Sequence, residues 1–148
     1  MIEKMNRLRE LRGLRRSIAE KDAERARAAR SEFERKVSAA EDAHARAVSD
    51  SVTRRRAALD ALSSQPATPL TIARMANVNG MIDHELAGLS GEADEAREGL
   101  EGAEAELVAK RDVLATFLRK EEAADSAAER WEEDHRHLRD AEEDDPDA

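Results

Sequence analysis

The chain has 148 residues, of which 40% are charged and 2% aromatic, and its formal net charge is −9. Much of the apolar fraction is alanine, which buries little surface, so the composition argues against a compact globular core and favours long helices with a narrow apolar seam. Cysteine is absent, which excludes disulfides and thiolate metal sites. The sequence contains no run of eighteen apolar residues, so no membrane-spanning helix is expected. The N-terminal region lacks the apolar core of a signal peptide, so we expect a soluble cytoplasmic protein.

The first predicted helix covers about residues 2–63. Its apolar residues recur with a mean step close to 3.5, which is typical of a coiled coil, and steps of four follow each other near residues 18–26 and 44–52. The predicted line consists of Ile2, Met5, Leu8, Leu11, Leu14, Ile18, Asp22, Ala26, Ala29, Phe33, Val37, Ala40, His44, Val48, Val52, Arg55, Leu59 and Leu62.

A loop is predicted over about residues 64–68. Pro66 and Pro69 cannot lie inside a helix, because each lacks an N–H group and its ring clashes with the preceding turn. Thr68 followed by Pro69 matches the N-cap and first position of a new helix. So short a connection between two long helices favours an antiparallel hairpin.

The second predicted helix covers about residues 69–140, and an acidic tail follows at 141–148. Along this helix a line of seventeen positions follows intervals of four and three residues in strict alternation, and fourteen of these positions are apolar. The line consists of Ile82, Leu86, Leu89, Ala93, Ala96, Leu100, Ala103, Leu107, Lys110, Leu114, Phe117, Glu121, Ala124, Ala128, Trp131, His135 and Leu138. The expected fold is therefore all-α, with two long helices forming one antiparallel coiled-coil hairpin in a single domain.

Charge supports this pairing. Residues 1–36 have a net charge of +5 and residues 121–148 a net charge of −10, so folding at the loop brings opposite charges together. We expect the numbers of facing residues to sum to about 131, which places Leu59 opposite Ile72. In this register the polar residues that interrupt the two apolar lines also face each other, because Asp22 falls opposite Lys110.

Five of the six glycines fall inside the second helix, at positions 80, 88, 91, 99 and 102. They lie off the apolar line, so packing is not expected to require them. Each costs about 1 kcal/mol relative to alanine in a helix. These glycines are interpreted either as neutral substitutions that the helix tolerates, or as residues that make the half of the helix near the bend more flexible.

No residue pattern predicts an enzyme, a cofactor or a metal site. His135 and His137 are two residues apart on a helix and point in different directions, so they cannot share one metal ion. His44 and His84 are expected to lie at the edge of the seam. The basic run at 54–56 does not indicate nucleic-acid binding, because the net charge is negative and aromatic residues are almost absent.

Two groups of apolar residues are not fully explained by the hairpin. Trp131 continues the apolar line where no first helix remains to cover it, so it either folds over Ile2 and Met5 or contacts another protein. Near the bend, Leu62, Leu70, Ile72 and Met75 either pack the bend or form a second contact surface.

The chain resembles the central stalk proteins of type III secretion systems, the YscO/SctO family, which is related to flagellar FliJ. The resemblance covers the whole chain and rests on its size, its hairpin pattern, its basic start and its acidic end. Residues 117–122 (FLRKEE) and the later run at 131–134 (WEED) are the segments that most resemble the family.

This resemblance implies a non-enzymatic stalk without cofactors, located at the cytoplasmic face of the secretion apparatus. Its implied partners are the hexameric secretion ATPase at the end with both termini, the cytoplasmic ring of the export gate at the bend, and secretion chaperones. The ATPase end would then contain Ile2, Met5, Trp131, His135 and Leu138. The export-gate end would contain Leu62, Leu70, Ile72 and Met75. A structural coiled-coil spacer or tether unrelated to secretion is the alternative.

Overall fold

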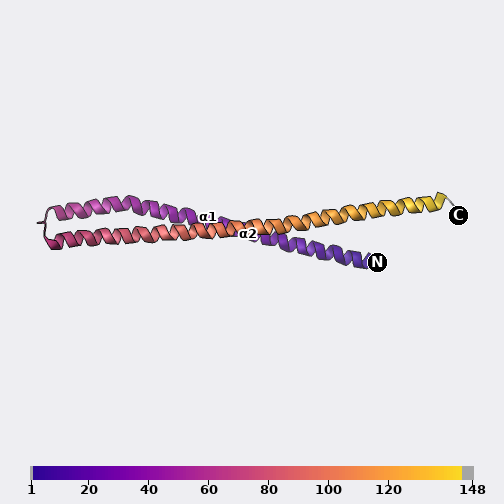
Figure 1. The fold of residues 1–148 in the computed structure, drawn as a ribbon, viewed down its shortest axis with the longest axis horizontal. Coiled ribbons are helices and arrows are strands. Elements are labelled where there is room, and N and C mark those ends of the chain that lie inside the picture. Colours follow the sequence, from indigo (N-terminus) through magenta and orange to yellow (C-terminus); the bar gives the residue numbers. More distant parts are fainter. Residues whose placement is uncertain (1, 145–148) are drawn as a thin grey trace. The chain divides into compact units, whose positions relative to one another are not determined.

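The computed structural model consists of two α-helices joined by one short loop (Figure 1). Helix α1 spans Ile2–Ser63 and helix α2 spans Pro69–Asp144. The structure describes the backbone of residues 2–144 and the side chains of residues 7–137, and no strand occurs in this part of the chain. The expected all-α helical hairpin is confirmed. Helix α2 continues to Asp144, whereas the sequence analysis ended it near residue 140.

Contacts divide the chain into two units. Unit 1 contains residues 1–26 and 107–148, and unit 2 contains residues 27–106. Each unit therefore contains a stretch of both helices.

Ion pairs establish the antiparallel direction of the helices in unit 2. Arg54 pairs with Glu85 at 2.6 Å, Glu41 with Arg97 at 2.7 Å, and Arg30 with Glu104 at 3.3 Å. As the position on α1 moves away from the loop, its partner on α2 moves away by a similar number of residues. Two N–H groups of Arg97 donate to the same Glu41 oxygen, and this carboxylate raises the pKa of Arg97 above its usual value.

The apolar line predicted on α2 is confirmed along most of its length. All fourteen of its positions from Ile82 to Ala128 are buried or half-buried, and the step pattern of four and three never slips. The most deeply buried are Ile82, Ala93, Ala103 and Leu107. Alternating steps of four and three keep this line on one side of α2, where helix α1 covers it.

The apolar line predicted on α1 is wrong in part. Val48, Val52 and Leu59 are exposed, and the residues that are buried or half-buried nearby are Ala47, Ser51, Arg55 and Ala58. A step of four turns an α-helix about 40° beyond a full turn, so two successive steps of four carry position 52 about 80° away from position 44. The prediction followed the larger side chains at positions 48 and 52, whereas in the structure a step of three after His44 brings Ala47 and then Ser51 inward.

A second correction concerns the predicted contact beside the bend. Leu59 and Ile72 were expected to face each other, but both side chains are more than half exposed. They lie at the surface, and Ala58 is turned inward in place of Leu59.

Ile82 is the only large side chain of the described residues that is almost completely buried, with 1% of its surface exposed. Arg55 pairs with Asp83 and Arg54 pairs with Glu85, so this part of α1 lies across from Ile82. Ser51, one turn earlier on α1, is also buried, and its hydroxyl donates to the Val48 carbonyl at 2.7 Å. A small residue on α1 thus leaves room for a large one on α2, and its hydroxyl remains satisfied.

Gly99 lies against a side chain of α1, contrary to the expectation that all the glycines of the second helix lie off the seam. A Cβ atom at position 99 would lie 2.5 Å from Phe33 Cε1 and 2.8 Å from Phe33 Cδ1. The Phe33 ring therefore occupies the space that a side chain at this position would need. At Gly80, Gly88 and Gly102 a Cβ atom would meet no neighbour, so packing does not require these glycines.

The loop is closed by reciprocal hydrogen bonds at the start of α2. The Thr68 hydroxyl accepts from the Thr71 N–H at 3.3 Å, and the Thr71 hydroxyl accepts from the Thr68 N–H at 2.9 Å. The Thr71 hydroxyl also lies 3.1 Å from the Pro66 carbonyl oxygen. Helix α2 begins at Pro69, so the predicted N-cap at Thr68 is confirmed.

Replacing Thr68 with alanine should lower the free energy of unfolding by about 1 kcal/mol, because the first turn of α2 loses its cap. Urea denaturation followed by circular dichroism measures this change. Thr116→Ala is the matched control, since the Thr116 hydroxyl donates only to the Asp112 carbonyl within α2. The cap assignment is contradicted if both variants unfold at the same urea concentration.

Candidate partner-binding surfaces

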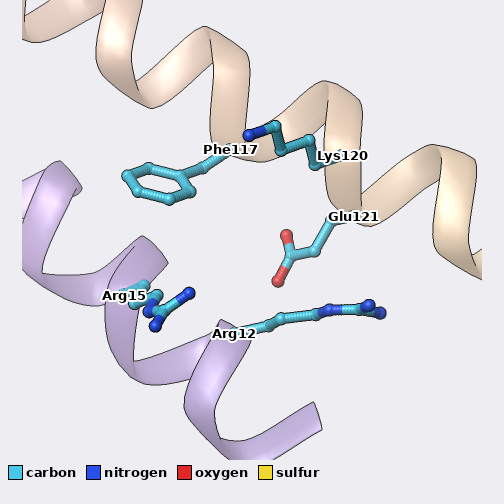
Figure 2. Close-up of a pocket in the computed structure, with 5 residues that line it drawn as sticks. All are labelled: Arg12, Arg15, Phe117, Lys120 and Glu121. Carbon is cyan, nitrogen blue, oxygen red and sulfur yellow. The ribbon is translucent and has the colours of Figure 1, made fainter. Parts of the chain in front are cut away.

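Unit 1 contains a cavity of about 320 Å³ between the two helices. Arg12 and Arg15 line it from α1, and Phe117, Lys120 and Glu121 line it from α2. Figure 2 shows the Phe117 ring projecting toward α1 and the Glu121 carboxylate pointing toward the same helix. The cavity thus combines an aromatic wall with three cationic side chains.

The one carboxylate of this cavity is already engaged. Arg16 pairs with Glu121 across the helices at 3.2 Å and with Glu20 along α1 at 2.8 Å. Glu20 and, to a smaller extent, Glu121 raise the pKa of Arg16 above its usual value. Arg12 and Arg15 have no ion pair with any side chain in residues 7–137. The cavity is therefore positively charged and suited to an anionic group such as a carboxylate.

A second cavity of unit 1 brings the predicted register pair together. Asp22 and Lys110 both line this space of about 180 Å³, together with Ile18 and Phe117. Asp22 forms its ion pair with Arg25, one turn along α1, at 3.6 Å. Asp22 and Lys110 thus line the same small cavity in the seam, without an ion pair between them.

The start of α1 has a row of exposed apolar side chains. We use the name leucine stripe for Leu8, Leu11, Leu14 and Ile18, each of which is more than half exposed. Ala19 is buried in the seam in place of Ile18, so the α1 seam in unit 1 lies beside the stripe and not on it. The sequence analysis placed these four residues in the seam, and the structure contradicts this placement.

Trp131 is 54% exposed, so α1 does not cover it. Its ring stacks on that of His135, with 3.8 Å between the ring centroids, and His135 Nδ1 lies 3.1 Å from the Trp131 carbonyl oxygen. These contacts hold the indole against its own helix. The other residues expected at this end, Ile2, Met5 and Leu138, have side chains outside the described residues.

The four residues predicted near the bend differ in their exposure. Leu62 and Met75 are half-buried and contribute to packing in unit 2. Leu70 and Ile72 are at least 60% exposed and remain at the surface. The structure therefore brings only one half of this set to the surface beside the loop.

The groups needed for metal chemistry or membrane spanning are not found among the described residues. No cluster of three His, Cys, Asp or Glu side chains could hold a metal ion there. Within the same part of the chain, neither helix contains a stretch apolar enough to cross a membrane.

Sequence reasoning missed the cationic cavity. The expected register, with facing numbers that sum to about 131, places Leu14 opposite Phe117, whereas Arg12 and Arg15 line the cavity beside this ring. The spacing of Leu8, Leu11 and Leu14 could have indicated this. Two successive intervals of three residues rotate the leucines around α1, away from the face that alternating intervals of three and four would keep in the seam.

Comparison of the chain with protein-family models, curated proteins and solved structures finds no significant match.

Proposed function

We propose that the chain is the non-enzymatic stalk of a type III protein secretion apparatus, where it links the hexameric secretion ATPase to the export gate and supports protein export. The observation that carries the proposal is the hairpin itself, in which α1 and α2 are joined by one short loop and packed along a seam. Among the described residues, six of the seven buried side chains are apolar and four of these are alanines, so the seam serves packing and leaves partner recognition to the exposed groups.

Two separate exposed groups support a protein with two partners. In unit 1, Trp131 and the cationic cavity combine aromatic and charged side chains, which are enriched at the centres of protein interfaces. In unit 2, Leu70 and Ile72 present apolar surface beside the loop. In this proposal the first group binds the ATPase and the second binds the cytoplasmic ring of the export gate, with secretion chaperones as a further class of partner.

Long helices suit a stalk because a packed helical element can transmit an orientation between two sites. The proposed location follows from the partners and is the cytoplasmic face of the secretion apparatus. A spacer or tether unrelated to secretion is the competing function, and it requires neither of the two partners.

The proposal is tested with the purified chain and a purified hexameric secretion ATPase of an injectisome. We expect the chain to be retained by the immobilised ATPase and to raise its rate of ATP hydrolysis. Trp131→Ala should weaken retention at least tenfold, since a large aromatic anchor commonly contributes 2 kcal/mol or more to an interface. The double variant L70A/I72A should bind the ATPase normally and lose binding to the export-gate ring.

Met81→Ala provides the control for these variants, because Met81 is equally exposed but belongs to neither group. A chain that neither binds the ATPase nor changes its turnover is not a secretion stalk, and the spacer function then replaces it.

A further inference from the structure

We propose that two copies of the chain associate through unit 1, with the leucine stripe of one copy receiving the acidic segment around Trp131 of the other. This self-association does not depend on the proposed stalk function, and because it uses Trp131, Arg12 and Arg15 it would compete with the proposed ATPase contact for the same surface. It is carried by two surfaces of the same chain that are both exposed, both partly apolar and opposite in charge.

The first surface is basic. Every residue from 7 to 18 is exposed, and this segment contains five arginines and one glutamate, a net charge of +4. Arg12 and Arg15 belong to this segment and line the cavity beside Phe117, and neither has an ion pair within residues 7–137. A partner that covers the stripe would therefore also meet unpaired cations along its edge.

The second surface is acidic. Residues 122–137 contain six acidic and two basic residues, a net charge of −4. Trp131 is its large exposed apolar group, and Glu132 and Asp134 lie on either side of it around α2, about 100° and 60° away. Neither carboxylate has an ion pair within the described side chains.

A second copy satisfies both surfaces at once. In a twofold dimer the basic stripe of each copy meets the acidic segment of the other, so every contact occurs twice. An interface of Arg12 and Arg15 with Glu132 and Asp134 also neutralises charges that have no ion pair among the side chains of residues 7–137.

Other occupants fit only one of the two surfaces. An anionic membrane would attract the leucine stripe, but the acidic segment of the same unit would be repelled. An acidic helix of a different protein would cover the stripe and leave Trp131 exposed.

Charge reversal tests the pairing by sedimentation of the purified full chain. The wild type should form a dimer with rising concentration, and the dimer should weaken in high salt. R12E/R15E and E132R/D134R should each be monomeric, because each places like charges against each other. An equimolar mixture of the two variants should dimerise again, since the reversed stripe then meets the reversed segment and the two unaltered surfaces meet each other.

R27E/R35E is the matched control, with the same change in net charge. Arg27 and Arg35 are exposed on α1, lie outside residues 7–18 and form no ion pair with a described side chain, so this variant should dimerise like the wild type. Circular dichroism verifies that each variant keeps its helices, and R12Q/R15Q replaces the reversal variant if it does not; it should also weaken the dimer.

Three results would overturn the proposal. The wild type could remain monomeric at every concentration, with or without binding to vesicles of anionic lipid. The two reversal variants could dimerise as the wild type does. Their mixture could remain monomeric although both variants are folded.

Discussion

Replacing Ile82 with alanine should lower the free energy of unfolding by about 2–5 kcal/mol, the range measured when a large buried aliphatic side chain is truncated. Ile82 is 1% exposed and lies where Arg54 and Arg55 of α1 pair across the seam. Ser51, the buried α1 residue about one turn before this pair, is too small to fill the space left by the removed atoms. The loss therefore includes a cavity as well as the lost burial.

Denaturation of wild type and variant at matched concentrations measures this effect. Met81→Ala is the control, because Met81 is the adjacent residue on α2 and is 63% exposed. This control should change the free energy of unfolding by less than about 0.5 kcal/mol, as is usual for surface positions. Equal losses in the two variants would contradict the assignment of Ile82 to the seam.

Replacing Gly99 with alanine should destabilise the chain, although the same change elsewhere in α2 should stabilise it. The new Cβ atom would lie 2.5 Å from the Phe33 ring, and overpacking of this kind costs about 1–3 kcal/mol. The better helix propensity of alanine returns about 1 kcal/mol. We expect a net loss of about 1 kcal/mol, measured as a lower urea midpoint.

Gly102→Ala is the matched control, since it lies one turn further along α2 and its Cβ atom would meet nothing within 4 Å. It should raise stability by about 1 kcal/mol through helix propensity alone. Adding Phe33→Leu to Gly99→Ala should recover part of the loss, because the smaller side chain leaves room for the methyl group. If the two glycine variants respond alike, Phe33 does not pack on Gly99.

The architecture of the hairpin could be predicted from the sequence because its strongest signals are local. Pro66 and Pro69 exclude a helix, and Thr68 provides the cap, so the loop and the start of α2 were predicted correctly. The regular spacing on α2 also identified its seam from Ile82 to Ala128 without an error.

The seam of α1 could be predicted only in part, because size and spacing conflict there. Val48 and Val52 have larger apolar side chains than Ala47 and Ser51, but the smaller pair continues the regular steps and is the one turned inward. The side chains of α2 decide this choice, since Ile82 fills the seam at the level of Ser51. A prediction that considers one helix at a time has no access to that information. The contact of Gly99 with Phe33 was missed although the expected register places Phe33 opposite residue 98, because the glycines were judged only by their distance from the apolar line of their own helix.

The candidate surfaces could also be predicted only in part. Trp131 was identified because it continues the apolar line beyond the end of its partner helix, and it is indeed exposed. The cavity of Arg12 and Arg15 was not identified, since it depends on the rotation of α1 that moves the leucine stripe out of the seam.

The central claim is that one chain folds back on itself in a fixed antiparallel register, and site-specific crosslinking tests it most directly. The chain has no cysteine, so E41C/R97C introduces the only two thiols, at positions whose native side chains pair at 2.7 Å. A short bismaleimide should join them within a monomer in dilute solution. E41C/S90C should react poorly, because a shift of seven residues moves the second thiol about 10 Å along α2. Crosslinks that form only between two chains, or equally well in both variants, would contradict the hairpin and its register.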